Sequence, residues 1–87
     1  MKVYDKAIWH IDGGESKDEV LKKFATIFTY LKKNEMLTDE GLEIFDLGID
    51  SSVSLHERLV NDKGKVFLDK TYDSLLKLSC EQMENYL

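Results

Sequence analysis

The chain has 87 residues, with 12 Lys or Arg against 17 Asp or Glu, and its formal net charge is −5. A chain of this length builds one hydrophobic core, so we expect a single domain over residues 1–87. Its negative field repels nucleic acid and anionic membranes and attracts basic surfaces, so neither nucleic acid nor a membrane is expected as a partner.

Residues 1–12 are compatible with a helix or with a strand. A helix would align four apolar side chains on one face, namely Met1, Tyr4, Ile8 and Ile11. Gly13 and Gly14 would then end it. A strand would align a different set, namely Val3, Ala7, Trp9 and Ile11. Because Asp5 interrupts that alternation, we prefer the helix and keep the strand as the alternative.

The strongest helix signal lies between Ser16 and Asn34. Its apolar residues repeat at the spacing of one helix face and predict a core-facing stripe: Val20, Phe24, Ile27, Phe28 and Leu31. Ser16 is placed to cap the helix N-terminus, and Glu19, three residues further on, can complete a capping box. We expect the rest of the chain to pack around this helix.

A second, shorter helix is predicted from Asp39 to Leu47. Thr38 precedes it as an N-cap, and Gly48 follows it as a residue that adopts a left-handed conformation without strain. Leu42 and Phe45 are expected to face the core. Residues 49–60 then predict an irregular or weakly extended connection.

The last element begins at Asn61, which is placed to cap a helix from Asp62 to at least Leu78. Its predicted core stripe consists of Leu68, Tyr72, Leu75 and Leu76, continued by Met83 and Tyr86. A second apolar row consists of Phe67, Thr71 and Leu78. A surface this wide indicates burial on two sides, either within the fold or against a partner. Together the elements predict a mainly α fold, a small compact bundle of three to four helices with or without a short extended pair.

Residues 37–46, LTDEGLEIFD, and residues 59–69, LVNDKGKVFLD, are locally similar. Each places a capping residue before an acid, a glycine and an apolar run. Two helix starts with the same local chemistry explain this similarity, and we do not infer a repeat.

The stretch before the last helix resembles part of a known fold. The pattern L-x-x-x-x-G-x-x-F-L at residues 59–68 is similar to the exit from the wing of a winged-helix domain. A winged-helix-like arrangement is therefore the alternative fold, and it implies DNA binding where a recognition helix is present. The helix in that position, residues 39–47, is acidic without a basic residue and would be repelled by phosphates.

Two histidines near carboxylates raise the question of a metal or acid–base site. His10 and Asp12 lie two residues apart, and His56 is followed by Glu57. The spacing matches neither HExxH nor CxxC, nor the i, i+4 ligand pairs of helical metal sites. We predict no metal site, no cofactor and no catalytic residue, with both histidines at the surface or half-buried.

Cys80 is the one cysteine, so an intrachain disulfide is excluded and a reducing compartment is favoured. The first twelve residues include Asp5 and contain no uninterrupted apolar run, unlike a signal peptide, so we expect a cytoplasmic protein. Cys80 is expected near the end of the last helix, before Glu81, where the local field disfavours a thiolate.

Residues 35–50 carry the acidity of the chain. They contain no Lys or Arg and six acidic residues, which we predict to bind a partner: Glu35, Asp39, Glu40, Glu43, Asp46 and Asp50. With −6 in this segment and −5 in the whole chain, the remainder carries about +1. Such a cluster is usually a solvated face, and it is also what a protein that docks on a basic surface would present.

The sequence therefore favours a small acidic, non-enzymatic protein-interaction domain, such as an inhibitor, an immunity-type protein or an adaptor. Its expected partner is a basic protein surface, and a homo-oligomer would add buried area to a small core. The alternatives are a winged-helix-like DNA-associated regulator and a small metal-dependent enzyme.

Overall fold

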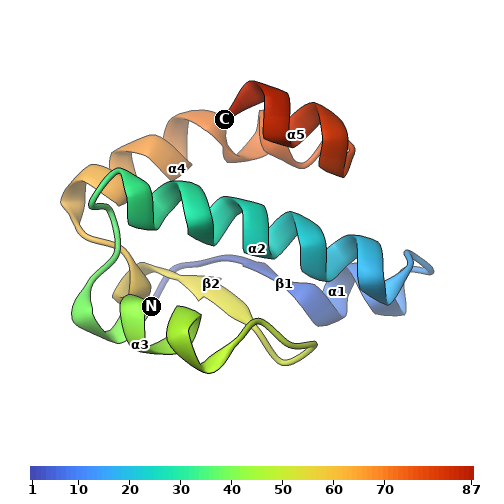
Figure 1. The fold of residues 1–87 in the computed structure, drawn as a ribbon, viewed down its shortest axis with the longest axis horizontal. Helices are drawn as coiled ribbons and strands as arrows, with labels where there is room; N and C mark the ends of the chain where they lie inside the picture. Colours follow the sequence, from blue (N-terminus) through green and yellow to red (C-terminus); the bar gives the residue numbers. More distant parts are fainter.

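The computed structural model describes residues 1–87 and shows five α-helices with a short antiparallel strand pair (Figure 1). The elements in chain order are β1 (Val3–Lys6), α1 (Ala7–Asp12), α2 (Lys17–Lys33), α3 (Asp39–Leu47), β2 (Ser54–His56), the 3-10 turn η1 (Glu57–Leu59), α4 (Asp62–Leu75) and α5 (Cys80–Tyr86). The predicted mainly α fold with a short extended pair is confirmed. None of the helices combines the length and the apolar character that a bilayer crossing requires.

Helix α2 lies in the middle of the molecule, between α4 and α5 on one side and the strand pair with α1 and α3 on the other (Figure 1). All five residues of its predicted stripe are buried. The hydroxyl of Ser16 accepts a hydrogen bond from the backbone N–H of Glu19, as expected for the N-cap. The predicted central helix is therefore confirmed.

The first twelve residues contain both of the structures that the sequence allowed. Residues 3–6 form β1, which pairs antiparallel with β2, and residues 7–12 form α1. The register shifts between Val3 and Asp5, so the strand does not follow a simple alternation. Asp5 is consequently the buried side chain of β1, and a helix over the whole stretch is wrong.

The connection after α3 is more regular than we predicted. Helix α3 has the predicted bounds and ends at Gly48, whose φ of 100° lies in the left-handed region. Residues 54–56 then form β2, and residues 57–59 form η1. Leu55 and Leu59 are fully buried, which explains why this segment is held in place.

The predicted continuous helix from Asp62 to Leu78 is wrong. Helix α4 ends at Leu75, and a second helix, α5, begins at Cys80. The break follows from a local signal, because the Ser79 and Gln82 side chains each bond the other's backbone N–H in a complete capping box. As a result Leu76 is 45% exposed and Tyr86 is 54% exposed, whereas Met83 remains in the core.

The two similar stretches of sequence lie against each other. Leu37 and Val60 form an isolated antiparallel bridge. Around it, the Thr38 N–H donates to the Leu59 carbonyl and the Asn61 N–H donates to the Met36 carbonyl, both at 2.9 Å. We call this pair of helix starts, residues 36–41 and 59–64, the clasp.

The glycines of the clasp allow its close packing. A Cβ on Gly41 would lie 2.2 Å from the Leu59 carbonyl oxygen, and a Cβ on Gly64 would lie 2.8 Å from the Met36 carbonyl oxygen. The same glycines donate to the helix caps. The Gly41 N–H donates to the Thr38 hydroxyl, and the Gly64 N–H donates to the Asn61 side-chain oxygen. The sequence similarity thus has a tertiary cause beyond helix capping.

The strand pair is not a wing. β1 and β2 are separated in the chain by α1, α2 and α3, so no β-hairpin connects them. Residues 59–68, which resemble the exit from a wing, form the end of η1 and the first half of α4.

Candidate functional site

The six acidic residues predicted to bind a partner are all exposed: Glu35, Asp39, Glu40, Glu43, Asp46 and Asp50. Four of them lie on α3, whose N-terminus is capped by Thr38 and carries acids in its first turn. A negative charge at that end is favourable because it faces the positive end of the helix dipole. Glu35 and Asp50 lie outside the helix, one before it and one after it.

The outer face of α3, which we define as Asp39, Glu40, Glu43, Asp46 and Leu47, combines charge with an apolar side chain. At about 100° per residue, Leu47 lies between Glu43 and Glu40 on the side away from Gly41, the buried position of this helix. Leu47 is 78% exposed, the highest value among the large apolar residues.

The acidic segment is barely neutralised within the chain. Its one ion pair joins Lys32 Nζ to Asp46 Oδ1 at 4.0 Å. Asp50 is used locally, since it accepts hydrogen bonds from the Ser52 hydroxyl and N–H, and these bonds lower the pKa of Asp50. The remaining carboxylates of the outer face are open to solvent.

A groove of about 320 Å³ lies beside this face, between α3 and the segment around β2. Its apolar lining consists of Ile44, Leu47, Val53 and Leu59. Its polar lining includes Asp50 and His56. An apolar side chain from a partner would find a hydrophobic surface here next to negative charge.

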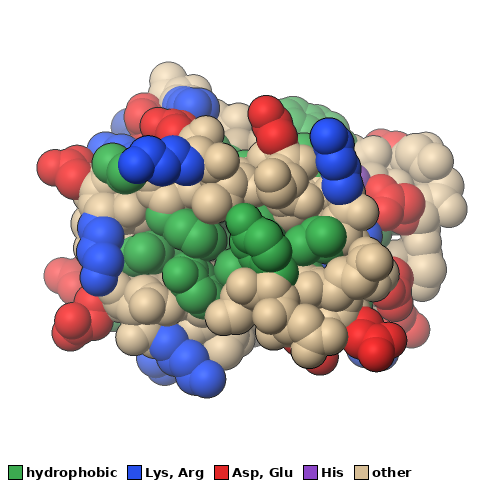
Figure 2. Space-filling view, turned by 90° about the horizontal axis from the view of Figure 1, so that it is seen from above, with side chains coloured by type: hydrophobic (Ala, Val, Ile, Leu, Met, Phe, Trp, Pro, Cys, Tyr) green, Lys and Arg blue, Asp and Glu red, His purple; other side chains and the backbone are tan.

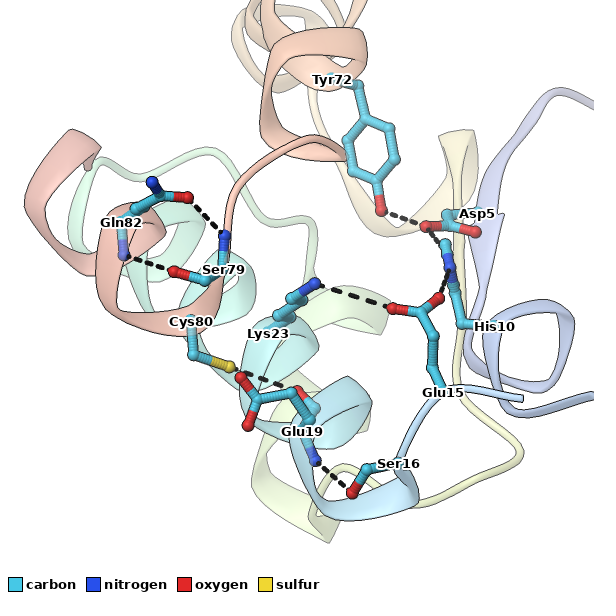
Figure 3. Close-up of polar contacts among 10 residues, drawn as sticks. All are labelled: Asp5, His10, Glu15, Ser16, Glu19, Lys23, Tyr72, Ser79, Cys80 and Gln82. Carbon is cyan, nitrogen blue, oxygen red and sulfur yellow. Dashed lines mark hydrogen bonds and ion pairs between the residues drawn. The ribbon is translucent and has the colours of Figure 1, made fainter. Parts of the chain in front are cut away.

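A second site, which the sequence analysis did not identify, is centred on the buried side chain of Asp5 (Figure 3). One of its oxygens, Oδ2, accepts the Tyr72 hydroxyl at 2.6 Å and lies 2.7 Å from His10 Nε2. The other oxygen accepts the Lys6 backbone N–H at 2.8 Å. The network joins β1 and α1, which follow each other in the chain, to α4, which is distant in sequence.

His10 is held on both of its ring nitrogens. Nδ1 lies 2.8 Å from Glu15 Oε2, while Nε2 faces Asp5 (Figure 3). Partial burial lowers the pKa of His10, but the hydrogen bonds and charges of Asp5 and Glu15 outweigh it, so its pKa is raised. Asp12, the carboxylate that we considered as its partner, is exposed and takes no part.

The space beside this network is too small for an organic substrate. A cavity of about 30 Å³ borders Asp5, His10 and Tyr72 and is otherwise lined mainly by apolar side chains. That volume corresponds to one water molecule. No group of three or more His, Cys, Asp or Glu side chains is arranged to hold a metal ion. His56 instead accepts the Arg58 N–H as the N-cap of η1.

Cys80 is the first residue of α5, so its predicted place near a helix end is wrong. Its thiol donates to the Glu19 carbonyl at 3.3 Å (Figure 3). Burial, followed by hydrogen bonding and charge of the Glu19 side chain, raises the pKa of the Cys80 thiol in spite of the helix N-terminus. The thiol therefore stays protonated at neutral pH.

The second apolar row of α4 is partly covered within the fold. Phe67 stacks on Tyr30 of α2, with ring centroids 4.8 Å apart, and both side chains are half-buried. Figure 2 shows apolar side chains gathered in the middle of the face that carries α4 and α5, with charged groups around its margin.

Comparisons with protein-family models, with curated proteins and with solved structures found no match for this chain.

Proposed function

We propose that the chain is a non-enzymatic interaction domain of the cytoplasm that docks on a basic protein surface through the outer face of α3. The observation that carries the proposal is the combination on one short helix of four exposed carboxylates and a leucine that is 78% exposed. The partner would present Lys or Arg side chains around an apolar contact.

The charges of this face suit fast association with a basic surface. Complementary charges steer two proteins together and mainly increase the association rate. Within the chain, the like charges at Asp39, Glu43 and Glu40 repel one another, and the one ion pair of this face is that of Asp46 with Lys32. A basic partner would replace that repulsion by attraction.

Leu47 would supply an apolar contact at the centre of the interface. Full burial of a leucine side chain is worth about 1.5–3 kcal/mol, and in the isolated domain most of that is not realised. The groove lined by Ile44 and Val53 continues the same apolar surface. We therefore expect Leu47 to affect the dissociation rate and the carboxylates to affect the association rate.

The experiment compares the parent with a variant in which Glu40→Gln, Glu43→Gln and Asp46→Asn remove three charges while retaining size. A control variant, Asp12→Asn with Asp73→Asn and Glu84→Gln, removes the same charge from exposed positions elsewhere. Each protein, immobilised, is exposed to a cytoplasmic extract, and proteins lost only with the α3 variant are identified by mass spectrometry.

For each partner found, association rates are then measured at two salt concentrations. We expect the α3 variant to associate more slowly than both other proteins and to depend less on salt. Leu47→Ser should leave the association rate unchanged and accelerate dissociation. Equal rates and equal salt dependence for the α3 variant and the control variant would reject the proposed surface.

A further inference from the structure

The His10 side chain bridges two carboxylates, those of Asp5 and Glu15, through its two ring nitrogens. Its ring lies between Asp5 on β1 and Glu15 in the turn that joins α1 to α2 (Figure 3). Both oxygens are acceptors at 2.7–2.8 Å, so both ring nitrogens must donate. An imidazole has two N–H groups only when it is protonated, so this geometry is that of an imidazolium.

Few polar or charged groups of the neighbouring elements face His10. β1 contributes Asp5, α4 contributes the Tyr72 hydroxyl to the same Asp5 oxygen, and the turn contributes Glu15. α2 contributes Lys23, whose ammonium lies 3.8 Å from Glu15, and the edge of the Phe24 ring. The other residues lining the adjacent cavity from α4 and α5 are apolar, namely Leu75, Leu76 and Met83.

If His10 became neutral, one of its two hydrogen bonds, to Asp5 or to Glu15, would be lost. The burial of the two carboxylates determines which bond is lost. The Asp5 side chain is 6% exposed, so an unpaired lone pair there would be costly. The Glu15 side chain is 45% exposed and can be hydrated instead. The neutral ring therefore keeps its proton on Nε2 toward Asp5 and turns the lone pair of Nδ1 toward Glu15, which it then repels.

We propose that His10 is a pH-sensitive latch that fastens the turn between α1 and α2 to the buried Asp5 when it is protonated and releases Glu15 when it is neutral. The turn is suited to opening because it contains Gly13 and Gly14, the latter at a φ of 98°. Its backbone is held by hydrogen bonds to the end of α1, among them Glu15 N–H to the His10 carbonyl at 3.1 Å.

The sign of the pH effect follows from the direction of the shift. Below the ordinary histidine pKa of 6.5, His10 is protonated in the folded and unfolded chain, and its stabilisation is complete. The stabilisation is lost as the pH rises through the raised pKa of the folded state. Between these two pKa values the unfolding equilibrium constant increases about tenfold per pH unit, as expected for one proton.

Titration of the whole chain, with both histidines labelled with ¹⁵N and observed by NMR, tests the latch. In the parent we expect two ring N–H signals for His10 at neutral pH and a His10 pKa above the ordinary histidine value of 6.5. Hydrogen exchange of the Gly14 and Glu15 amides should accelerate through the His10 pKa beyond the ordinary base-catalysed increase. His56→Gln is the matched control and should leave all of this unchanged.

Glu15→Gln distinguishes a latch from a merely structural histidine. An amide side chain can accept from a protonated Nδ1 or donate to a neutral one, so the turn should stay closed at every pH. We expect a lower His10 pKa and no pH-dependent step in the exchange of the turn. This position is exposed, so the variant should fold even if His10→Gln does not. A His10 pKa at or below the ordinary value of 6.5, or the same pH-dependent opening in Glu15→Gln as in the parent, would overturn the proposal.

Discussion

Asp5 is the residue at which the N-terminal part of the chain is attached to the core. It is 4% exposed, and every polar group it meets is a donor: the Tyr72 hydroxyl, the His10 ring and the Lys6 N–H. Hydrogen bonds to a charged group are stronger than neutral ones, and a buried carboxylate that loses a donor is penalised.

Tyr72→Phe tests the contribution of one donor to this network. The substitution removes only the hydroxyl, so it should destabilise the fold by about 1.5–3 kcal/mol, the range for a hydrogen bond to a charged group. Denaturant unfolding of the variant and the parent at neutral pH measures the difference. Tyr86→Phe, at a residue that is 54% exposed, is the control and should have no effect. Equal stability of Tyr72→Phe and parent would show that Asp5 does not depend on this bond.

Cys80 illustrates how a tertiary contact offsets a local field. A helix N-terminus alone would lower the pKa of a thiol, but burial and the carboxylate side chain of Glu19 raise the pKa of Cys80. We expect slow alkylation of the native protein at pH 7, with fast alkylation after denaturation. Cys80→Ser should retain the fold, since a hydroxyl can donate to the Glu19 carbonyl as the thiol does. Rapid alkylation of the native thiol would contradict the raised pKa.

At the level of the elements, α2 supplies the largest share of the aromatic core. Phe28 is fully buried and stacks on Phe45 of α3, with ring centroids 6.2 Å apart. Phe24 is 2% exposed and lines the small cavity together with Leu75 of α4 and Met83 of α5. One face of α2 thus packs against α3 on one side and faces α4 and α5 on the other.

Phe24→Ala should destabilise the domain by about 3–5 kcal/mol, the usual cost of truncating a core phenylalanine. In a domain this small, that loss is comparable with the total free energy of unfolding, so we expect the variant to be largely unfolded. Circular dichroism and thermal unfolding measure the change. Thr29→Ala, on the exposed side of α2, serves as the control. A melting temperature within a few degrees of the parent would mean that α2 does not carry the core.

The helices that were correctly predicted are those whose ends and faces have local signals. For α2 and α3, the caps Ser16 and Thr38 and the apolar spacing were sufficient. The division of the last helix was missed because the apolar spacing continues across the break, although the Ser79 and Gln82 capping box was present in the sequence. At that point the apolar spacing and the capping box indicate different helix ends, and the structure follows the capping box.

The polar network could not be predicted from local patterns. The bond from Tyr72 to Asp5 connects residues 67 positions apart, and the pairing of β1 with β2 depends on the same long-range arrangement. From the sequence alone, Asp5 was only an interruption in an alternating stretch. The acidic segment was visible because its six acidic residues all fall within residues 35–50, which contain no Lys or Arg, but the place of Leu47 among them required the structure.

At the scale of the whole molecule, the clasp determines how closely α3 approaches η1 and how closely α4 approaches Met36. In an ordinary helix, Gly→Ala is stabilising by roughly 0.5–1 kcal/mol. At Gly41 the new Cβ would instead overlap the Leu59 carbonyl, which belongs to the backbone and cannot rotate away. The sign of the effect should therefore reverse.

Gly41→Ala is expected to destabilise the domain by about 1–3 kcal/mol, the cost of overpacking, or more if the clasp separates. Glu43→Ala in the same helix, at an exposed position, is the control and should be close to neutral. Urea unfolding of both variants gives the comparison. A Gly41→Ala protein as stable as the control would show that α3 can shift away from η1 without loss.

The clasp also has a consequence for the order in which the chain folds. Its Thr38 hydroxyl bonds a carbonyl 20 residues away, whereas the Asp5 to Tyr72 bond closes a separation of 67 residues. Closing the longer loop costs about 1 kcal/mol more in chain entropy, so the clasp should form before the N-terminal strand docks. Gly41→Ala should then slow folding, while Tyr72→Phe should mainly accelerate unfolding, as stopped-flow measurements in urea would show. The lifetime of the folded protein would be governed by β1, the segment that contributes least to the speed at which the fold is reached.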